Sequence, residues 1–145
     1  MVNGCWQDMP ITAPGKPADA LGVLGEVMIR RLVELEADMR YQKPPAEDEF
    51  EIGYTVGAVP MLISAPHGAK HARFDPEQGR RKPKDEDEFT AGLARLVAER
   101  SGAHVLWLRR KSDEDPNSDE QCRYKHVLDS YVHQHGIRFV LDIHG

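Results

Sequence analysis

The chain has 145 residues, enough for one domain with a hydrophobic core and too few for two. Its apolar share of 40% and charged share of 30% are typical of a soluble globular protein, and a net charge of −5 argues against a nucleic-acid-binding surface or a polybasic membrane patch. Cys5 and Cys122 form no CxxC pair, no apolar run reaches the roughly 18–20 residues of a membrane span, and no secretory signal is recognisable. We therefore expect a cytoplasmic protein.

The first 49 residues divide into two segments. Residues 1–18 contain three prolines and no hydrophobic periodicity, which predicts an extended leader. Residues 19–49 are predicted to form a helix that begins near Asp19, followed by a linker from Pro44 onward. The apolar residues that recur at three- and four-residue spacing are Leu21, Leu24, Met28, Leu32, Leu35 and Met39. This stripe indicates a helix that packs on a sheet or on a neighbouring subunit, so a homo-oligomer is possible.

Residues 50–145 alternate between strand-like and helix-like patterns. The expected strands cover 50–56, 59–63, 105–108 and 139–143, and 70–84 is expected to be a loop. One expected helix begins near Phe89 and is closed by Ser101-Gly102, and the other begins near Tyr124 and ends near Gly136. From residue 59 onward the order strand, helix, strand, helix, strand predicts parallel strands with right-handed crossovers. We predict a three-layer α/β fold with a mostly parallel sheet flanked by helices, of the phosphorylase/hydrolase-like type. No covering helix follows the last strand, so we expect a C-terminally truncated domain, or a partner that supplies the cover.

Two histidines follow predicted strands. His67 comes four residues after Ile63, and His144 directly follows Ile143. The carboxyl ends of neighbouring parallel strands lie at one edge of a sheet, so both imidazoles are expected there. Two neutral imidazoles with a carboxylate suit zinc and leave one coordination position for water.

The carboxylate is expected to come from the acidic run 85–88, which precedes a predicted helix. The same acids could instead cap that helix and complement its dipole. Asp142 lies two residues before His144 on the same strand face, so it could orient an imidazole or simply bond to loop amides. His71 is interpreted as a solvated loop histidine, although it could be a metal ligand or line the site.

Arginines are frequent in the neighbouring loops, and a guanidinium suits a substrate carboxylate. The candidates are Arg73, Arg80, Arg81, Arg109 and Arg110. Asp115-Pro116-Asn117 is a turn signal first, with Asn117 a secondary site candidate. The GxSxG, GxxxxGK[ST] and GxGxxG motifs are absent, and Cys122 is interpreted as structural. His104, His126, His133 and His135 are interpreted as surface or capping residues.

Three segments together resemble the N-formylglutamate amidohydrolase family, which is related in fold to the zinc carboxypeptidases. They are the segments 63–68 (ISAPHG), 84–90 (KDEDEFT) and 141–145 (LDIHG). The resemblance covers about residues 50–145 and not the N-terminal helix. It implies zinc held by His67, Asp87 and His144, with Glu86 and Glu88 as alternative acidic ligands. It also implies that Arg109 and Asn117 line the substrate side.

The resemblance implies hydrolysis of the amide of an N-acyl amino acid by metal-activated water. Its general base is expected beyond Gly145, so the activity of the chain alone stays open. One alternative is a carboxypeptidase-like or other acyl-amino-acid hydrolase acting on a short peptide. The other is a non-catalytic, truncated assembly module.

Overall fold

The structure, a computed structural model, describes residues 17–145 as a mixed α/β fold. The helices are α1 (Pro17–Glu36), α2 (Thr90–Ser101) and α3 (Arg123–His135). The strands are β1 (Ile52–Thr55), β2 (Met61–Ala65), β3 (His71–Asp75), β4 (Arg80–Lys84), β5 (His104–Leu108) and β6 (Phe139–Asp142). In this part of the chain, no helix is long and apolar enough to cross a lipid bilayer. The expected leader falls almost wholly on residues 1–16, outside the described residues.

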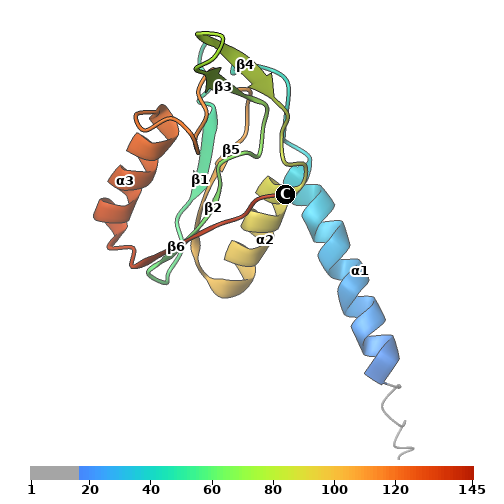
Figure 1. The fold of residues 1–145 in the computed structure, drawn as a ribbon. Helices are drawn as coiled ribbons and strands as arrows, with labels where there is room; N and C mark the ends of the chain where they lie inside the picture. Colours follow the sequence, from blue (N-terminus) through green and yellow to red (C-terminus); the bar gives the residue numbers. More distant parts are fainter. Residues whose placement is uncertain (1–16) are drawn as a thin grey trace, which may run out of the picture.

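The main sheet has four strands in the order β1-β5-β2-β6 (Figure 1). β5, β2 and β6 are mutually parallel, which confirms the prediction from the alternation of elements. The helices α2 and α3 lie in the connections that parallel pairing requires. β1 pairs antiparallel with β5, and β6 forms the opposite edge, where Leu141 lies beside Ile63.

Alternating side chains of β2 and β5 fill two hydrophobic clusters on opposite faces of the sheet. The cluster beside α2 contains Ile63, Ala65, Val105, Trp107, Ala91, Ala94 and Ala98. The cluster beside α3 contains Leu62, Leu106, Leu108, Cys122, Tyr124 and Tyr131. Small alanine side chains on α2 let this helix approach the sheet closely. Gly102 and Gly136 end α2 and α3 in left-handed conformations, as the sequence predicts.

Only the C-terminal part of α1 packs on the rest of the fold (Figure 1). Leu35 and Met39 are buried, whereas Leu21 and Ile29 are largely exposed. The reason is length, because α1 has 20 residues and its neighbour α2 has 12. At 1.5 Å per residue they are about 30 Å and about 18 Å long, so α1 extends beyond its neighbour. The predicted stripe is therefore used for packing only at its C-terminal end.

The predicted loop at 70–84 is instead a two-stranded antiparallel hairpin of β3 and β4. Gly79 turns the chain with φ +60°. An ion pair joins Lys82 to Asp75, and the Arg81 guanidinium donates a hydrogen bond to the Ala72 carbonyl oxygen at 2.7 Å. The hairpin is stabilised by polar interactions and lacks the alternation of apolar and polar residues by which a strand is recognised in sequence. A prediction from hydrophobic pattern therefore does not detect it.

The acidic run 85–88 does not form the first turn of α2. The helix begins at Thr90, after Phe89 in a left-handed conformation with φ 62°, and has no acid in its first turn. The buried carboxylate of Glu36 takes that place, because its Oε2 accepts a hydrogen bond from the Gly92 amide at 2.6 Å. A carboxylate thus complements the dipole of α2, but α1 supplies it.

Gly53 of β1 tests how tightly the α2 face is packed. A Cβ at this position would overlap the indole ring of buried Trp107, which also carries the Arg95 guanidinium 4.6 Å from its centroid. We expect Gly53→Ala to lower the free energy of unfolding by about 2 kcal/mol in urea denaturation, because the ring has no room to move.

The control is Gly25→Ala in the exposed part of α1, where a Cβ meets nothing within 4 Å. Alanine favours the helix, so this change should raise the free energy of unfolding by up to about 1 kcal/mol. Equal effects of the two substitutions would contradict tight packing at Gly53.

Candidate metal centre

His67 lies in the turn after β2, two residues beyond Ala65, and is 7% exposed. The residue that follows it must be glycine, because there is no room for a side chain at this position. A Cβ on Gly68 would lie 2.6 Å from the carbonyl oxygen of Leu108, the last residue of β5. The His-Gly pair therefore places the imidazole close to the carboxyl ends of two adjacent strands.

His144 reaches the same edge because β6 runs parallel to β2. Ser64 is paired with Asp142, and His144 follows two residues later. The ring centroids of His67 and His144 are 5.0 Å apart, with the ring planes at 73°. The predicted juxtaposition of these two imidazoles is confirmed.

Asp87 lies between the two imidazoles. Its Oδ2 is 3.6 Å from Nδ1 of His67 and 3.6 Å from Nδ1 of His144. The backbone fixes its position, because the Asp87 amide donates to the His67 carbonyl oxygen at 2.9 Å. The Thr90 hydroxyl donates to the Asp87 carbonyl oxygen at 2.6 Å. The start of α2 is thereby tied to the turn after β2.

The other three acids of the run 85–88 are directed elsewhere. Asp85 forms an ion pair with Lys70 at 3.1 Å, and Glu86 accepts a hydrogen bond from Gln42 at 3.4 Å. Glu88 is exposed. Asp87, the remaining acid of the run, is therefore the candidate metal ligand.

The three side chains fit a divalent metal ion. One donor atom from each lies within 4.8 Å of the other two. Zinc bonds of about 2.0–2.1 Å at tetrahedral angles place donors about 3.3–3.4 Å apart. The two distances of 3.6 Å are close to this value. Asp87 and His144 are partly exposed, which leaves access for a fourth ligand.

Asp115 forms a hydrogen bond with Nε2 of His67, the ring nitrogen that does not face Asp87. Its side chain is fully buried, and its Oδ1 lies 3.2 Å from Nε2 of His67. An ionised carboxylate only accepts hydrogen bonds, so Nε2 carries the ring proton and the lone pair of the neutral imidazole is on Nδ1. This is the tautomer required to bind a metal beside Asp87.

The charge of Asp115 is strongly stabilised. Burial alone would raise the pKa of its carboxyl group, but four hydrogen bonds outweigh burial and hold this pKa far below its usual range. The donors are Nε of Arg73 at 2.5 Å, the amides of Asn117 and Ser118 at 2.9 and 3.1 Å, and His67. Because a guanidinium already compensates this carboxylate, the neighbouring cluster of His67, His71 and Asp115 is less suited to a metal ion.

His71 is buried, which corrects its interpretation as a solvated loop histidine. It is 2% exposed, and its ring stacks on His67 with centroids 4.1 Å apart. Burial, with a smaller contribution from His67, lowers the pKa of His71. The side chain turns inward because β3, absent from the sequence prediction, begins at this residue.

Asp142 does not support either imidazole. It is exposed on β6, and within residues 17–145 it forms no ion pair or hydrogen bond with His67 or His144. The role expected of this residue is performed by Asp115. Its distance along the chain from both histidines hides it from a sequence pattern, although the turn signal at 115–117 correctly indicates that its carboxylate accepts nearby amides.

Three of the predicted substrate-side residues, Arg81, Arg109 and Asn117, lie at different places. Arg109 pairs with Glu49 at 2.9 Å, and Arg81 pairs with Asp119 at 2.7 Å. Asn117 is exposed and contributes its backbone amide to the Asp115 network. The structure does not bring these three side chains together at the donors.

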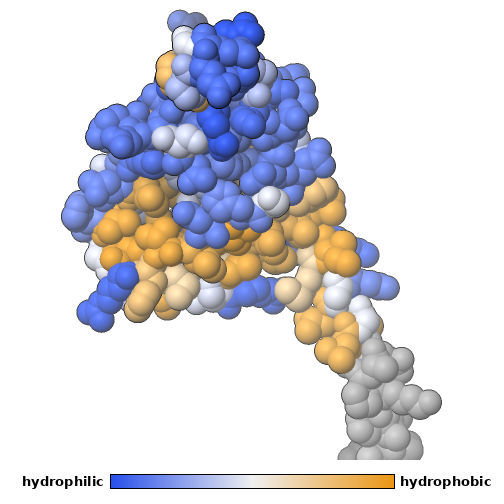
Figure 2. Space-filling view, viewed as in Figure 1, coloured by the Kyte–Doolittle hydropathy of each residue, from blue (hydrophilic) through white to orange (hydrophobic). Residues whose placement is uncertain are grey.

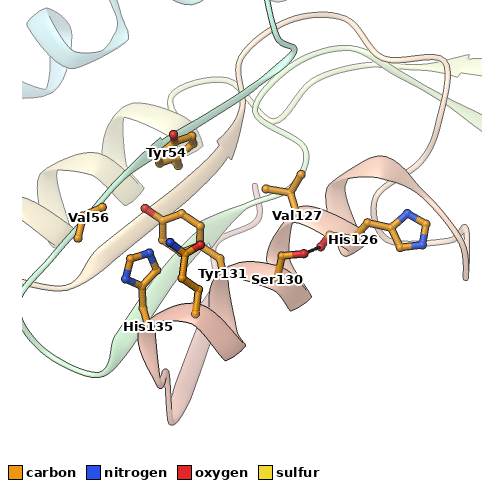
Figure 3. Close-up of a pocket in the computed structure, with 8 residues that line it drawn as sticks. Tyr54, Val56, His126, Val127, Ser130, Tyr131 and His135 are labelled. Atoms are coloured by element: carbon orange, nitrogen blue, oxygen red, sulfur yellow. Dashed lines mark hydrogen bonds between the residues drawn. The ribbon is translucent and has the colours of Figure 1, made fainter.

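Two hollows lie near these elements. One, of about 590 Å³, is lined by His71, Arg81, Lys111 and Arg123 among others. The other, of about 470 Å³, lies between β1 and α3 (Figure 3). It is lined by Tyr54, Tyr131 and His135 among others, and by none of the three metal donors. Neither hollow is lined by His67, Asp87 or His144, and the first adjoins the candidate centre only through His71, whose ring stacks on His67.

The remaining histidines fall into two groups. His126 and His133 are exposed, as the sequence predicts. His104 is buried and packs against Tyr131 and His135, so its interpretation as a surface residue is wrong. It lies at the start of β5, where the strand is covered by α3.

No protein-family model, no curated protein and no solved structure matches this chain. The chemistry of the centre is therefore inferred from its donor atoms and their surroundings.

Asp115→Asn tests the buried network. We expect a loss of about 2 kcal/mol in the free energy of unfolding at pH 7, because a charge-assisted network is replaced by a neutral amide beside Arg73. The native pKa of Asp115 is depressed, so its stabilisation is complete above the unfolded pKa of about 3.9 and disappears as pH falls toward the native pKa.

The difference between wild type and variant should stay constant from pH 7 to about 5 and shrink below about 4 in denaturant titrations. Asp113→Asn, at an exposed acid of the same loop, is the control and should change stability by less than about 0.5 kcal/mol. A difference that grows as pH falls would contradict the assigned charge state.

Proposed function

We propose that this chain carries the metal centre of a zinc-dependent amidohydrolase that acts on N-acyl amino acids of the formyl type, such as N-formylglutamate. The observation that supports this most is the Asp87 oxygen, placed 3.6 Å from Nδ1 of both His67 and His144. The motif resemblance to the N-formylglutamate amidohydrolase family supplies the substrate class. We also propose that residues 50–145 are the N-terminal part of a three-layer hydrolase-like fold in a cytoplasmic protein.

Zinc at this position would polarise the scissile carbonyl group and lower the pKa of a water molecule to about 7. His67 would hold the ion through Nδ1, because Asp115 keeps the ring proton on Nε2. Asp87 would contribute one negative charge. His144, two residues after the end of β6, would be the third protein ligand. The stacked ring of His71 covers His67 on the protein side, so ligands approach from the side of the exposed His144.

The acid group of the substrate requires a cationic contact. We propose Arg81 for this contact because it belongs to the hairpin that follows the turn of His67, although the hollow it lines contains none of the three donors. One of its nitrogens bonds to Asp119 and to the Ala72 carbonyl oxygen, and a guanidinium has further N–H donors for a carboxylate. Arg109 and Asn117 remain secondary proposals.

A second candidate function is a non-catalytic assembly module. It is favoured by the extensive exposed apolar surface of α1 and β6. A carboxypeptidase-like or other acyl-amino-acid hydrolase would use the same three donors. Because the resemblance places the general base later in the sequence than His144, metal binding is the property of this chain to measure first.

We expect about one zinc ion per chain in dialysed protein measured by plasma emission spectrometry. His67→Ala, Asp87→Ala and His144→Ala should each weaken zinc binding at least about 100-fold in competition with a chelating dye, because each removes one of three donors. His133→Ala, at an exposed histidine of α3, is the matched control and should bind like wild type. Folded wild-type protein that holds no zinc would refute the metal centre.

For zinc-loaded full-length gene product, which includes the general base that the resemblance implies beyond Gly145, we expect N-formylglutamate to be hydrolysed at least about tenfold faster than N-acetylglutamate or a glutamyl dipeptide, measured by amine release. His67→Ala should abolish the reaction, and His133→Ala should not change it. The reverse order of substrates would favour the carboxypeptidase-like alternative. Zinc-bound full-length gene product that hydrolyses none of them would favour the non-catalytic module.

A further inference from the structure

β6 has the features of an interface strand. All four of its residues are exposed, including Phe139 at 66% and Leu141 at 52%. Parallel strands are normally covered on both faces, and an open edge presents unpaired N–H and C=O groups to other strands. Proline and lysine, which often protect such edges, are absent from this strand.

The apolar surface continues beyond β6. In Figure 2 it forms a band that runs across the fold and onto α1. Leu93 and Val97 of α2, with Met28 of α1, line a shallow apolar groove along this band. The ten large apolar side chains exposed on α1 and β6 provide on the order of 1,000 Å². One partner of a standard interface contributes about 800 Å², so burying most of the band would suffice for a dimer.

We propose that two copies of this chain pair through β6 about a two-fold axis, so that their sheets join into one sheet of eight strands. A two-fold axis makes the paired edge strands antiparallel. The inference takes the second of the two expectations for β6, a partner that supplies the cover, and it does not depend on the proposed metal chemistry, because the paired residues end before His144.

The backbone limits the possible registers. The Arg138 amide donates to the Pro60 carbonyl oxygen at 2.9 Å, toward β2. Within the strand the direction is given by the Ile143 amide, which donates to the Ser64 carbonyl oxygen at 2.7 Å in register with the pairing of Ser64 and Asp142. Because backbone directions alternate along a strand, Phe139 and Leu141 direct their N–H and C=O groups to β2, and Val140 directs its groups to the open edge. A two-fold pair can therefore be centred on residue 139, 140 or 141.

Side-chain complementarity selects the register centred on Val140. It places Phe139 opposite Leu141 of the second copy and Arg138 opposite Asp142 of the second copy, each pair occurring twice. Arg138 and Asp142 are both exposed, and neither forms an ion pair within residues 17–145. Opposite charges and apolar pairs across an antiparallel ladder are stabilising. The registers centred on 139 and 141 would place Val140 opposite Arg138 or Asp142 instead.

Sedimentation velocity over a range of protein concentrations, in a buffer with a chelator, tests the pairing without reference to the metal centre. We expect a monomer–dimer equilibrium with a Kd on the order of micromolar. Arg138→Glu and Asp142→Arg should each raise this Kd at least about tenfold, because like charges then lie opposite each other twice. The double charge reversal restores opposite charges and should return the Kd to within about threefold of wild type.

Lys111→Glu, a charge reversal at an exposed lysine outside β6, is the matched control and should leave the Kd unchanged. Circular dichroism establishes that each variant is folded. A wild-type protein that stays monomeric at all concentrations would overturn the proposal. A dimer whose Kd is insensitive to the single reversals, or is not restored by the double reversal, would overturn it as well.

Discussion

The parallel pairing of β2 with β6 is the constraint on which the rest of the structure depends. It places the turn after β2 and the residues after β6 at one edge of the sheet, where His67 and His144 meet. An antiparallel β6 would put the second imidazole at the opposite end of a strand about 15 Å long, at 3.3 Å per residue. The crossover through α3 is what permits the parallel direction, so the packing of Tyr124 and Tyr131 on the sheet indirectly positions the candidate metal centre.

The buried carboxylate of Asp115 stabilises the fold and also fixes the tautomer of His67. An uncompensated charge in this position would be costly, and Arg73 with two backbone amides removes that cost. The same carboxylate decides which nitrogen of His67 carries the proton. The loop after β5 and the hairpin that contains Arg73 therefore support the imidazole together, although neither supplies a proposed metal ligand.

Prediction from sequence succeeded where local patterns coincide with tertiary burial. Gly102 and Gly136 end helices because only glycine adopts a left-handed conformation freely, and the alternation of elements implies parallel strands. It failed where polar residues determine structure. The hairpin of β3 and β4 depends on ion pairs, and α2 is capped by Glu36 from another helix rather than by the acids that precede it. Such partners are distant in sequence and leave no periodic signal.

By itself, the sequence determined the types and order of the elements from residue 50 onward, apart from the hairpin of β3 and β4, and the two histidines that follow strands. Hydrophobic periodicity and turn chemistry are local properties, so they can be recognised without coordinates. Only the tertiary structure decided that Asp87 lies between the imidazoles, that Asp115 supports His67, and that β6 is an open apolar edge. These facts depend on which segments meet in space. Contacts between segments 20 to 80 residues apart follow from packing of the whole chain.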